Sequence, residues 1–351
     1  MKIKQLQQEL RKKRVGFAVF SNFDMKPDPT LVYFANYLGA GFLVVPKDKR
    51  PFLIASNIDI SYSMGTGIKA YSWKDKPAFE IIKRHAGVTR LIGVDEKAVS
   101  VYLQKQLRKK FKARFKDISE ACIDLREIKT KEEIKLYRKA CRLTDEIVQR
   151  CINNFRRFKT EEDVSVFLKK EVLDNGVGLS FEPIVASGPN ASYSHKEPKG
   201  RLKKGFCVID FGINYKGRCT DITRTIYLGK PSKKEKEIYE AVLNAQLSAI
   251  KILKPGIPAK DVCDCAIKSL GTLSKYFTHG LGHGIGAEIH EKPNLSLKSK
   301  GVIKKNSIFT IEPGVYVKNK FGIRIEDDVL MLDKPIVLTK TSKKLMCIKA
   351  N

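Results

Sequence analysis

Two aspartates lie on either side of a predicted turn in the middle of the chain. Residues 206–213 are mostly apolar and β-prone around Asp210, which predicts a buried strand. Residues 214–217 have the composition of a turn, and residues 219–228 alternate and are rich in Thr, Ile and Tyr, as a returning strand would be. A hairpin there brings Asp210 and Asp221 together, and two such carboxylates both stay ionised only if a cation lies between them. On this hairpin alone, the alternative that Asp210 caps a turn while Asp221 faces water stays open.

A second unit of the same kind follows further along the chain. Residues 307–317 predict an apolar strand that carries Glu312, and its Ile-Glu-Pro-Gly sequence echoes Ile-Asp-Phe-Gly at 209–212. The chain is then expected to turn and to return with Arg324 and Glu326, which are two apart and so project from one face of the strand. The repeat suggests two related halves that face each other, with four carboxylates converging between them.

Histidines are scarce in the chain and gather in two short segments. Of the five, His279, His283 and His290 fall within residues 278–291, and His195 lies in a polar loop. Imidazole nitrogens are common metal ligands. The cluster therefore points to a metal site, with a purely structural cluster as the alternative.

The glycines that alternate through residues 280–286 do not form a dinucleotide fingerprint, which needs a strand before it, a helix after it and a later acid. They are expected instead to let the backbone approach a crowded metal site closely. The pair His279 and His283 lacks the glutamate of the helical zinc-protease motif. That mechanism is therefore disfavoured.

The composition is that of a soluble globular protein long enough for two domains. Of its 351 residues, 42% are hydrophobic and 30% charged, and no run is long enough to span a membrane. The eight cysteines are scattered without a C-x-x-C pair, which favours reduced thiols in a cytoplasmic protein. The net charge of +29, from 67 basic and 38 acidic residues, could also attract nucleic acid.

Local signals divide the chain near residues 124–130. The first 125 residues predict a small α/β domain, with strands at 15–21, within 31–46 and at 52–55, a first helix that buries Ile3, Leu6 and Leu10, and a basic helix at 101–111. In the remainder, helices are expected to open at Thr130, Thr160 and Ser232, with a fourth around 259–270.

Together these segments resemble the pita-bread metallopeptidases of family M24, which include Xaa-Pro dipeptidases (prolidases), aminopeptidases P and, more distantly, methionine aminopeptidases. The matching pieces are IDFG…CTDITRT, HGLGHGIGAEIHE, TIEPGVYV and GIRIEDDVL, in the family's order. LREIKTKEEIKLYRKA resembles the segment that opens the family's catalytic domain. The resemblance implies an α/β fold: a creatinase/prolidase-type N-terminal domain at 1–125, then a pita-bread catalytic domain with a pseudo-twofold β-sheet at 126–351.

The resemblance also implies roles for individual residues. Five of them would hold two divalent metal ions, Mn(II) or Co(II), with Zn(II) as a further option, because four carboxylates and one imidazole form a hard site. Asp221 and Glu326 would bridge the ions, Asp210 would complete one, and His283 with Glu312 the other. Glu312 would also take the proton from a water that bridges the ions. The remaining matches are His195 and His290, which line the substrate pocket, His279 near it, and Arg324 beside the last ligand.

The function that the resemblance implies is hydrolysis of the Xaa-Pro bond at the N-terminus of a dipeptide or short peptide. The expected partners are that substrate and a second copy of the chain in a homodimer, without membrane or nucleic acid. Asn294 stands where many prolidase-like relatives carry an arginine that could hold a dipeptide's carboxylate, which leaves aminopeptidase P activity open. Two alternatives are a non-catalytic pita-bread protein that binds nucleic acid through its basic surface, and metal-free, creatinase-like hydrolysis of a small amidino compound.

Overall fold

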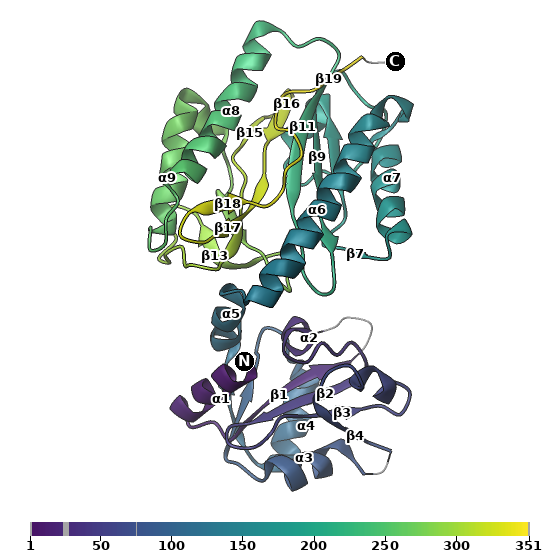
Figure 1. Ribbon diagram of the computed structural model, residues 1–351, viewed down its shortest axis with the longest axis vertical. Helices are drawn as coiled ribbons and strands as arrows, with labels where there is room; N and C mark the ends of the chain where they lie inside the picture. Colours follow the sequence, from purple (N-terminus) through teal and green to yellow (C-terminus); the bar gives the residue numbers. More distant parts are fainter. Residues whose placement is uncertain (1, 24–27, 75, 350–351) are drawn as a thin grey trace. The chain divides into compact units, whose positions relative to one another are not determined.

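A computed structural model describes residues 2–23, 28–74 and 76–349, and it divides the chain into two compact units, Met1–Arg126 and Glu127–Asn351. Figure 1 colours both units along the sequence. Among the described residues, no helix is both long and apolar enough to cross a membrane.

The first unit contains a six-stranded mixed sheet in the order β4-β3-β2-β1-β5-β6. β1 pairs antiparallel with β2 and parallel with β5, so it lies near the middle of the sheet. Its side chains alternate between the two faces: Ala18 and Phe20 pack in one apolar cluster, Phe17 and Val19 in another. The strands are β1 (Phe17–Asn22), β2 (Gly41–Pro46), β3 (Phe52–Ala55), β4 (Lys69–Ser72), β5 (Leu91–Val94) and β6 (Arg114–Asp117).

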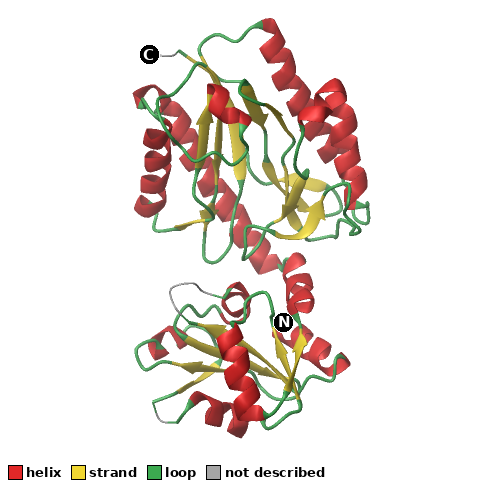
Figure 2. Cartoon of the chain, turned by 180° about the vertical axis from the view of Figure 1, so that it is seen from behind, coloured by secondary structure: helices red, strands yellow, loops and turns green. Residues whose placement is uncertain are grey.

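Helices cover both faces of this sheet, as Figures 1 and 2 show from opposite sides. Leu6 and Leu10 of α1 join the cluster on one face, and Leu107 of α4 joins the cluster on the other. The expected helices at the N-terminus and at 101–111 are thus confirmed, whereas α2 was not predicted from the sequence. The helices are α1 (Lys2–Lys12), α2 (Pro29–Ala35), η1 (Ile60–Ser63), α3 (Ala78–Ala86), α4 (Val101–Phe111) and α5 (Ser119–Glu127).

The first half of the second unit packs two helices against a sheet in the order β19-β11-β9-β8. β9 and β11 form the predicted antiparallel hairpin, in which Asp210 pairs with Thr223. Val148 of α6 and Leu168 of α7 pack in one apolar cluster with Ile209. The elements are α6 (Lys131–Asn153), η2 (Phe155–Arg157), α7 (Glu161–Asp174), β7 (Gly178–Leu179), β8 (Ile184–Ser187), η3 (Gly188–Ser192), β9 (Gly205–Phe211), β10 (Ile213–Asn214), β11 (Ile222–Leu228) and β19 (Cys347–Ile348).

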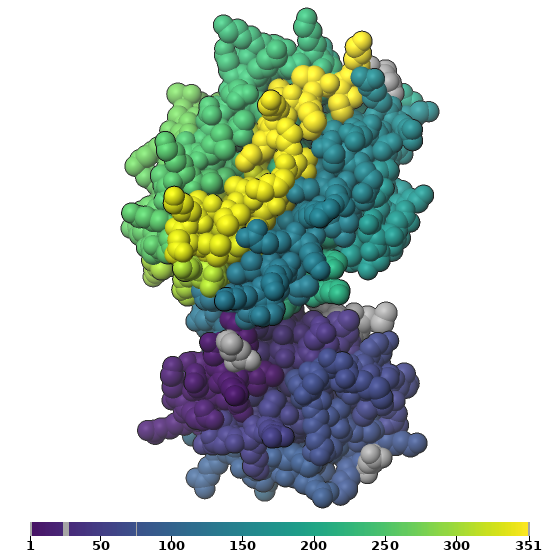
Figure 3. All heavy atoms as spheres, in the orientation of Figure 1, coloured from purple at the N-terminus to yellow at the C-terminus, as the bar shows by residue number. Residues whose placement is uncertain are grey.

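The second half repeats this plan with α8, α9 and a sheet in the order β13-β12-β14-β17-β18. Val242 of α8 and Val262 of α9 pack with Phe309 of β14. In Figure 1 this helix pair lies on the opposite side of the strands from α6 and α7, and in Figure 3 the last part of the chain, in yellow, runs over the surface between the two halves. The elements are α8 (Lys233–Ile252), α9 (Ala259–Leu270), η4 (Gly271–Tyr276), β12 (Gly282–Gly284), β13 (Glu291–Leu295), β14 (Ile308–Ile311), β15 (Gly314–Val317), β16 (Phe321–Arg324), β17 (Asp327–Met331) and β18 (Pro335–Val337).

The second acid-bearing unit differs from the single hairpin expected. The strand predicted at 307–317 is broken at Glu312 and Pro313: β14 before the break pairs with β17, and β15 after it pairs with β16 in a separate two-stranded sheet. Proline has no N–H to donate and cannot continue a ladder. The break places Glu312 at the junction of two sheets.

The helix starts of the second unit were predicted correctly. Thr130, Thr160 and Ser232 each accept a hydrogen bond from the third helical residue, whose own carboxylate accepts from the N-cap backbone. These capping boxes satisfy amides that would otherwise lack partners. They fix where the helices that support both sheets begin.

Candidate metal centre

The converging acids of the two halves line one cavity of about 450 Å³. All the site residues predicted from the sequence contribute to its wall: Asp210, Asp221, His283, Glu312, Glu326, His195, His279, His290 and Arg324. They come from both sheets and from the loops between them. The cavity is therefore a product of the two-half architecture.

Three of these side chains already have the spacing of a metal site. One ligand atom each from Asp221, His283 and Glu326 lies within 4.8 Å of the others. His283 Nε2 is 3.7 Å from Asp221 Oδ2 and 3.5 Å from Glu312 Oε1. One ion could contact side chains from both halves.

The hairpin and its neighbour hold the acids in place through backbone bonds. Asp210 is on β9 and Asp221 directly precedes β11, so the antiparallel pairing of these two strands keeps the acids close to each other. The Glu326 amide donates to the Thr223 carbonyl at 3.1 Å, which ties the second half to the first. The Glu312 amide donates to the Leu281 carbonyl at 2.8 Å and so fixes the break between β14 and β15.

The carboxylates of the cluster lack enough protein donors. Asp210 Oδ1, Asp221 Oδ1 and Glu326 Oε1 are buried and accept no hydrogen bond from the described residues. Burial, followed by repulsion from Glu326 and Asp210, raises the pKa of Asp221 well above its ordinary value. Burial also raises the pKa of Glu312 to about 7, although Arg324 opposes the shift. Buried oxygens that repel one another in this way fit a bound cation.

His283 has the form of a neutral ligand. Burial, followed by the charge of His290, lowers its pKa to about 4. Its Nδ1 lies 3.1 Å from the Gly284 carbonyl, so Nδ1 donates there and Nε2 keeps its lone pair toward the acids. A Cβ on Gly284 would lie 1.9 Å from the Lys292 carbonyl oxygen, so the glycine allows neighbouring backbone to approach this strand.

Arg324 links the acids to the other side of the cavity. Its Nη2 donates to Asp210 Oδ2 at 2.5 Å and its Nη1 to the Tyr316 hydroxyl at 2.8 Å. That hydroxyl is also 3.0 Å from His279 Nε2. Burial, followed by the charge of Arg324, lowers the pKa of His279 to about 4. His279 therefore belongs to a hydrogen-bonded chain beside the acids.

Two hydroxyl groups in the site were not predicted from the sequence. Thr223 donates to Glu326 Oε2 at 2.6 Å and accepts from Arg324 Nε at 3.0 Å. The Tyr316 hydroxyl joins Arg324 to His279. Thr223 is two residues after Asp221 on a strand, and this spacing is the signal that could have revealed it.

His195 and His290 are the exposed members of the site. The His290 and His283 ring centroids are 4.3 Å apart, and Asn294 lines the same cavity. Burial, followed by the nearby charge of His195, lowers the pKa of His290. Both histidines can therefore meet a molecule that enters the cavity.

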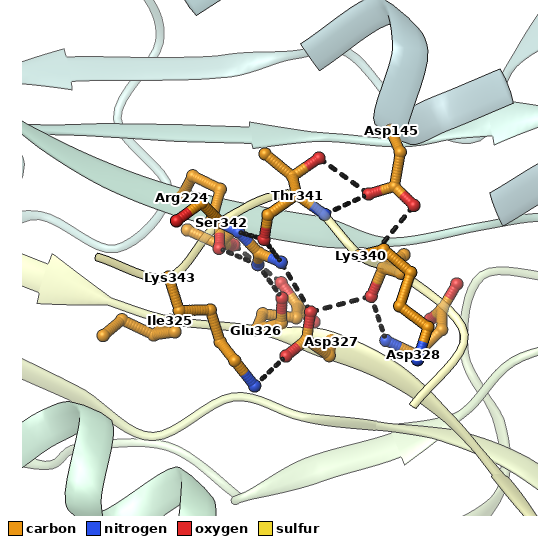
Figure 4. Close-up of polar contacts among 12 residues, drawn as sticks. Asp145, Arg224, Ile325, Glu326, Asp327, Asp328, Lys340, Thr341, Ser342 and Lys343 are labelled. Atoms are coloured by element: carbon orange, nitrogen blue, oxygen red, sulfur yellow. Dashed lines mark hydrogen bonds and ion pairs between the residues drawn. The ribbon is translucent and has the colours of Figure 1, made fainter. Parts of the chain in front are cut away.

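A buried ion-pair network contacts the backbone of Glu326, as Figure 4 shows. Arg224 Nη1 donates to the Glu326 carbonyl at 2.5 Å, and its Nη2 pairs with Asp327 Oδ1 at 2.6 Å. Lys343 Nζ contacts the other Asp327 oxygen at 2.8 Å. Burial would raise the pKa of Asp327, but Arg224 and Lys343 outweigh it and lower that pKa. The network fixes the backbone on which Glu326 stands.

Comparison with known families agrees with this arrangement. Residues 135–333 match the model of metallopeptidase family M24, and residues 2–128 match that of the creatinase/prolidase N-terminal domain. The chain belongs to metallopeptidase family M24. An M24 metallopeptidase is a hydrolase that uses divalent metal ions, in agreement with the enzyme class expected from the sequence.

Individual M24 relatives cover nearly the whole chain. An Xaa-Pro dipeptidase of Pyrococcus furiosus is 35% identical over 91% of this chain and 93% of its own. The solved prolidase of Pyrococcus horikoshii has a TM-score of 0.90 at 30% identity, covering 98% of this chain and 99% of that one. An X-Pro aminopeptidase of Thermotoga maritima has a TM-score of 0.87 at 27% identity, covering 96% and 100%. The pita-bread fold expected from the sequence is confirmed.

Proposed function

We propose that this M24 protein is a metal-dependent exopeptidase that hydrolyses the bond between an N-terminal residue and a following proline. The observation that carries the proposal is the convergence of Asp221, His283 and Glu326 ligand atoms within 4.8 Å. Relatives named Xaa-Pro dipeptidase and prolidase support the substrate class. Proline's tertiary amide has no N–H and restricts the residue before it, so its cleavage calls for a dedicated pocket.

The proposed ligands of two divalent ions are Asp210, Asp221, His283, Glu312 and Glu326. Four carboxylates and one imidazole suit Mn(II) or Co(II), with Zn(II) as a further option. Asp210, Asp221 and Glu326 each have a buried oxygen that accepts no hydrogen bond from any described residue, which supports this set. When bound, such ions lower the pKa of water and stabilise negative charge that develops on a carbonyl oxygen.

Glu312 is proposed as the general base as well as a ligand. A carboxylate beside the ions can accept the proton of a water that they hold. Thr310 donates a hydrogen bond to Glu312 Oε1 at 3.2 Å and so orients the carboxylate.

The side chains around the acids are proposed to bind the substrate. His195 and His290 line the open part of the cavity and can donate hydrogen bonds to the reacting peptide. Arg324 and His279 act from the buried side, where the Tyr316 hydroxyl joins them. Asn294 offers an amide and no charge to the substrate's C-terminal end. Tripeptides that begin Xaa-Pro are therefore expected as substrates beside dipeptides.

We further propose that the protein forms a homodimer and acts in the cytoplasm. We expect its domains to span residues 1–125 and 126–351. All eight cysteines are free thiols, six of them buried, which supports a reducing compartment. Light scattering should give twice the chain mass of 39.7 kDa. A measured mass equal to that of one chain would contradict the homodimer.

The substrate panel that tests this function is Ala-Pro, Ala-Pro-Gly and Ala-Ala, each with Mn(II) or Co(II) restored to the purified protein. Cleavage of the first two and weak cleavage of the third is the expected pattern. Equal cleavage of Ala-Ala would remove the proline specificity. Failure on all three substrates with metal bound would remove the peptidase assignment.

A further inference from the structure

A second cavity, of about 500 Å³, lies in the catalytic unit and shares no lining residue with the metal centre. Among the residues that the structure describes, six cationic side chains and no carboxylate contribute to its wall: Arg156, Lys159, Arg201, Lys203, Lys204 and Lys349. They come from three segments that are far apart in the sequence. The cavity therefore concentrates part of the chain's +29 charge around one concave surface.

Hydrogen bonds from backbone amides tie each of these three segments to a neighbouring part of the unit. The Leu202 amide donates to the Lys159 carbonyl at 2.9 Å, and Thr160 forms an isolated β-bridge with Arg201. The Lys203 amide donates to Ser187 Oγ at 2.9 Å. On the other side, the Gly229 amide donates to the Ile348 carbonyl at 2.7 Å. The cationic residues thus project from a fixed frame, which lowers the entropic cost of gathering them around a ligand.

The carboxylates nearest to this frame are directed at backbone amides. Glu161 Oε2 accepts from the Lys199 amide at 3.0 Å, and Glu162 accepts from the Gly200 amide at 2.8 Å. Asp163 interacts electrostatically with Lys159 but accepts from the Lys159 and Thr160 amides. These hydrogen bonds occupy carboxylate oxygens that could otherwise pair with lysine or arginine.

The cationic side chains themselves are exposed, and most have no ion pair. Within residues 2–23, 28–74 and 76–349, no carboxylate lies within 4.0 Å of the charged atoms of Lys159, Arg201, Lys203, Lys204 or Lys349. Glu235 interacts electrostatically with Lys204 from outside the cavity wall. Asp163 and Glu235 act on Lys159 and Lys204, but the cationic groups outnumber these two acids, and such an excess of like charge attracts a multivalent anion.

We propose that this cavity binds the oligophosphate group of a small molecule, either inorganic triphosphate or the triphosphate of a nucleotide. Closely spaced phosphate oxygens accept several charge-assisted hydrogen bonds from lysine and arginine at once. The half-buried Phe158 and Leu202 in the wall add an apolar surface that a nucleotide base could cover. The volume lies within the range of small-molecule sites, about 300–1,000 Å³.

Calorimetric titration tests the proposal on the metal-loaded full-length protein at about 0.15 M salt, with inorganic triphosphate and ATP supplied as Mg²⁺ complexes. The test variant is Arg201→Ser/Lys203→Ser. The matched control is Lys109→Ser/Lys110→Ser on α4, which removes the same charge from the other unit. Peptidase activity should be unchanged in both variants, since neither alters the metal centre, and it reports that each variant folds.

The test variant should bind triphosphate at least about tenfold more weakly for each charged hydrogen bond lost, and the control should bind like the wild type. Tighter binding of ATP than of inorganic triphosphate would indicate that the base of the nucleotide contacts Phe158 and Leu202. Equal binding would identify inorganic triphosphate as the ligand. The same affinity in all three proteins would overturn the proposal, because the anion would then bind at the metal centre or to diffuse charge. Binding of single-stranded RNA without binding of triphosphate would also overturn it.

Discussion

The hydroxyl of Thr223 donates a 2.6 Å hydrogen bond to Glu326 Oε2, and so joins the two halves of the catalytic unit at the metal centre. The same hydroxyl accepts from Arg324 Nε at 3.0 Å, so its proton is directed at Glu326. One oxygen of Glu326 is thereby held, while the other accepts no hydrogen bond from the part of the chain that the structure describes. The carboxylate is oriented before any ion binds.

Thr223→Val should weaken metal binding while the fold persists. Valine has the same shape but cannot orient Glu326, and loss of such an outer contact typically costs about 10–100-fold in metal affinity. Thr223→Ser keeps the hydroxyl and should bind metal nearly as the wild type does. Competition with a fluorescent chelator measures the affinities, and a Val variant with wild-type affinity would remove this role of Thr223.

Arg224→Met should destabilise the catalytic unit strongly. The substitution leaves buried Asp327 with Lys343 as its one cationic partner among the described residues, and breaking a buried pair in this way typically costs about 3–5 kcal/mol. Arg142→Met, which removes an exposed pair with Glu146, is the control and should cost less than about 1 kcal/mol. Denaturant unfolding followed by circular dichroism compares the two. If both variants lose less than about 1 kcal/mol in the free energy of unfolding, the network in Figure 4 adds little to stability.

Asp28→Asn should stabilise the first unit above pH 6. Burial raises the pKa of Asp28 to about 6, although the Leu31 and Thr30 amides oppose the shift. In the unfolded chain the pKa of Asp28 is near 4, so the unfolded state loses this proton at a lower pH than the folded state. Between pH 4 and pH 6 the free energy of unfolding of the wild type therefore falls by about 2–3 kcal/mol. Asparagine keeps the cap of α2 without the charge. The advantage of the variant should therefore be full above pH 6 and absent below pH 4.

Trp73, the chain's one tryptophan, makes this measurable, because it lies in the first unit. Urea unfolding followed by its fluorescence at pH 4 and pH 8 should show the difference only at pH 8. An equal effect at both pH values would mean that the ionisation of Asp28 is not the cause.

Local patterns in the sequence predicted the first acid-bearing hairpin and the helix starts. The hairpin that carries Asp210 and Asp221 depends on strand periodicity, and the cap at Thr130 depends on a four-residue motif, so both can be read within a short window. The break at Pro313 was missed because a run of apolar residues surrounds it, although proline's missing N–H was a usable signal.

Contacts between distant residues were not predictable from such windows. Thr223 and Glu326 are 103 positions apart, and the Tyr316 hydroxyl reaches His279 across 37. Likewise, Arg156, Arg201 and Lys349 line one cavity although they come from segments far apart in the sequence. Tertiary packing of the two halves decides these contacts.

Glu312→Gln separates the two roles proposed for that side chain. The amide keeps an oxygen for an ion but cannot accept a proton at neutral pH, so kcat on Ala-Pro should fall by about 10²–10⁴-fold. Metal content should fall less than in Asp221→Asn or Glu326→Gln, because those remove a carboxylate proposed to bridge the ions. A Glu312→Gln protein with full metal content and normal kcat would mean that the base lies elsewhere, with His290 as the next candidate.

The central claim is that the cluster of Asp210, Asp221, His283, Glu312 and Glu326 makes Xaa-Pro hydrolysis depend on two bound ions. The direct measurement is the rate of Ala-Pro hydrolysis against the number of Mn(II) or Co(II) ions bound per chain, starting from metal-stripped protein. Activity should be at background without metal and should reach its maximum when two ions are bound. Full activity in the metal-stripped protein, or two bound ions without Ala-Pro cleavage, would contradict the account.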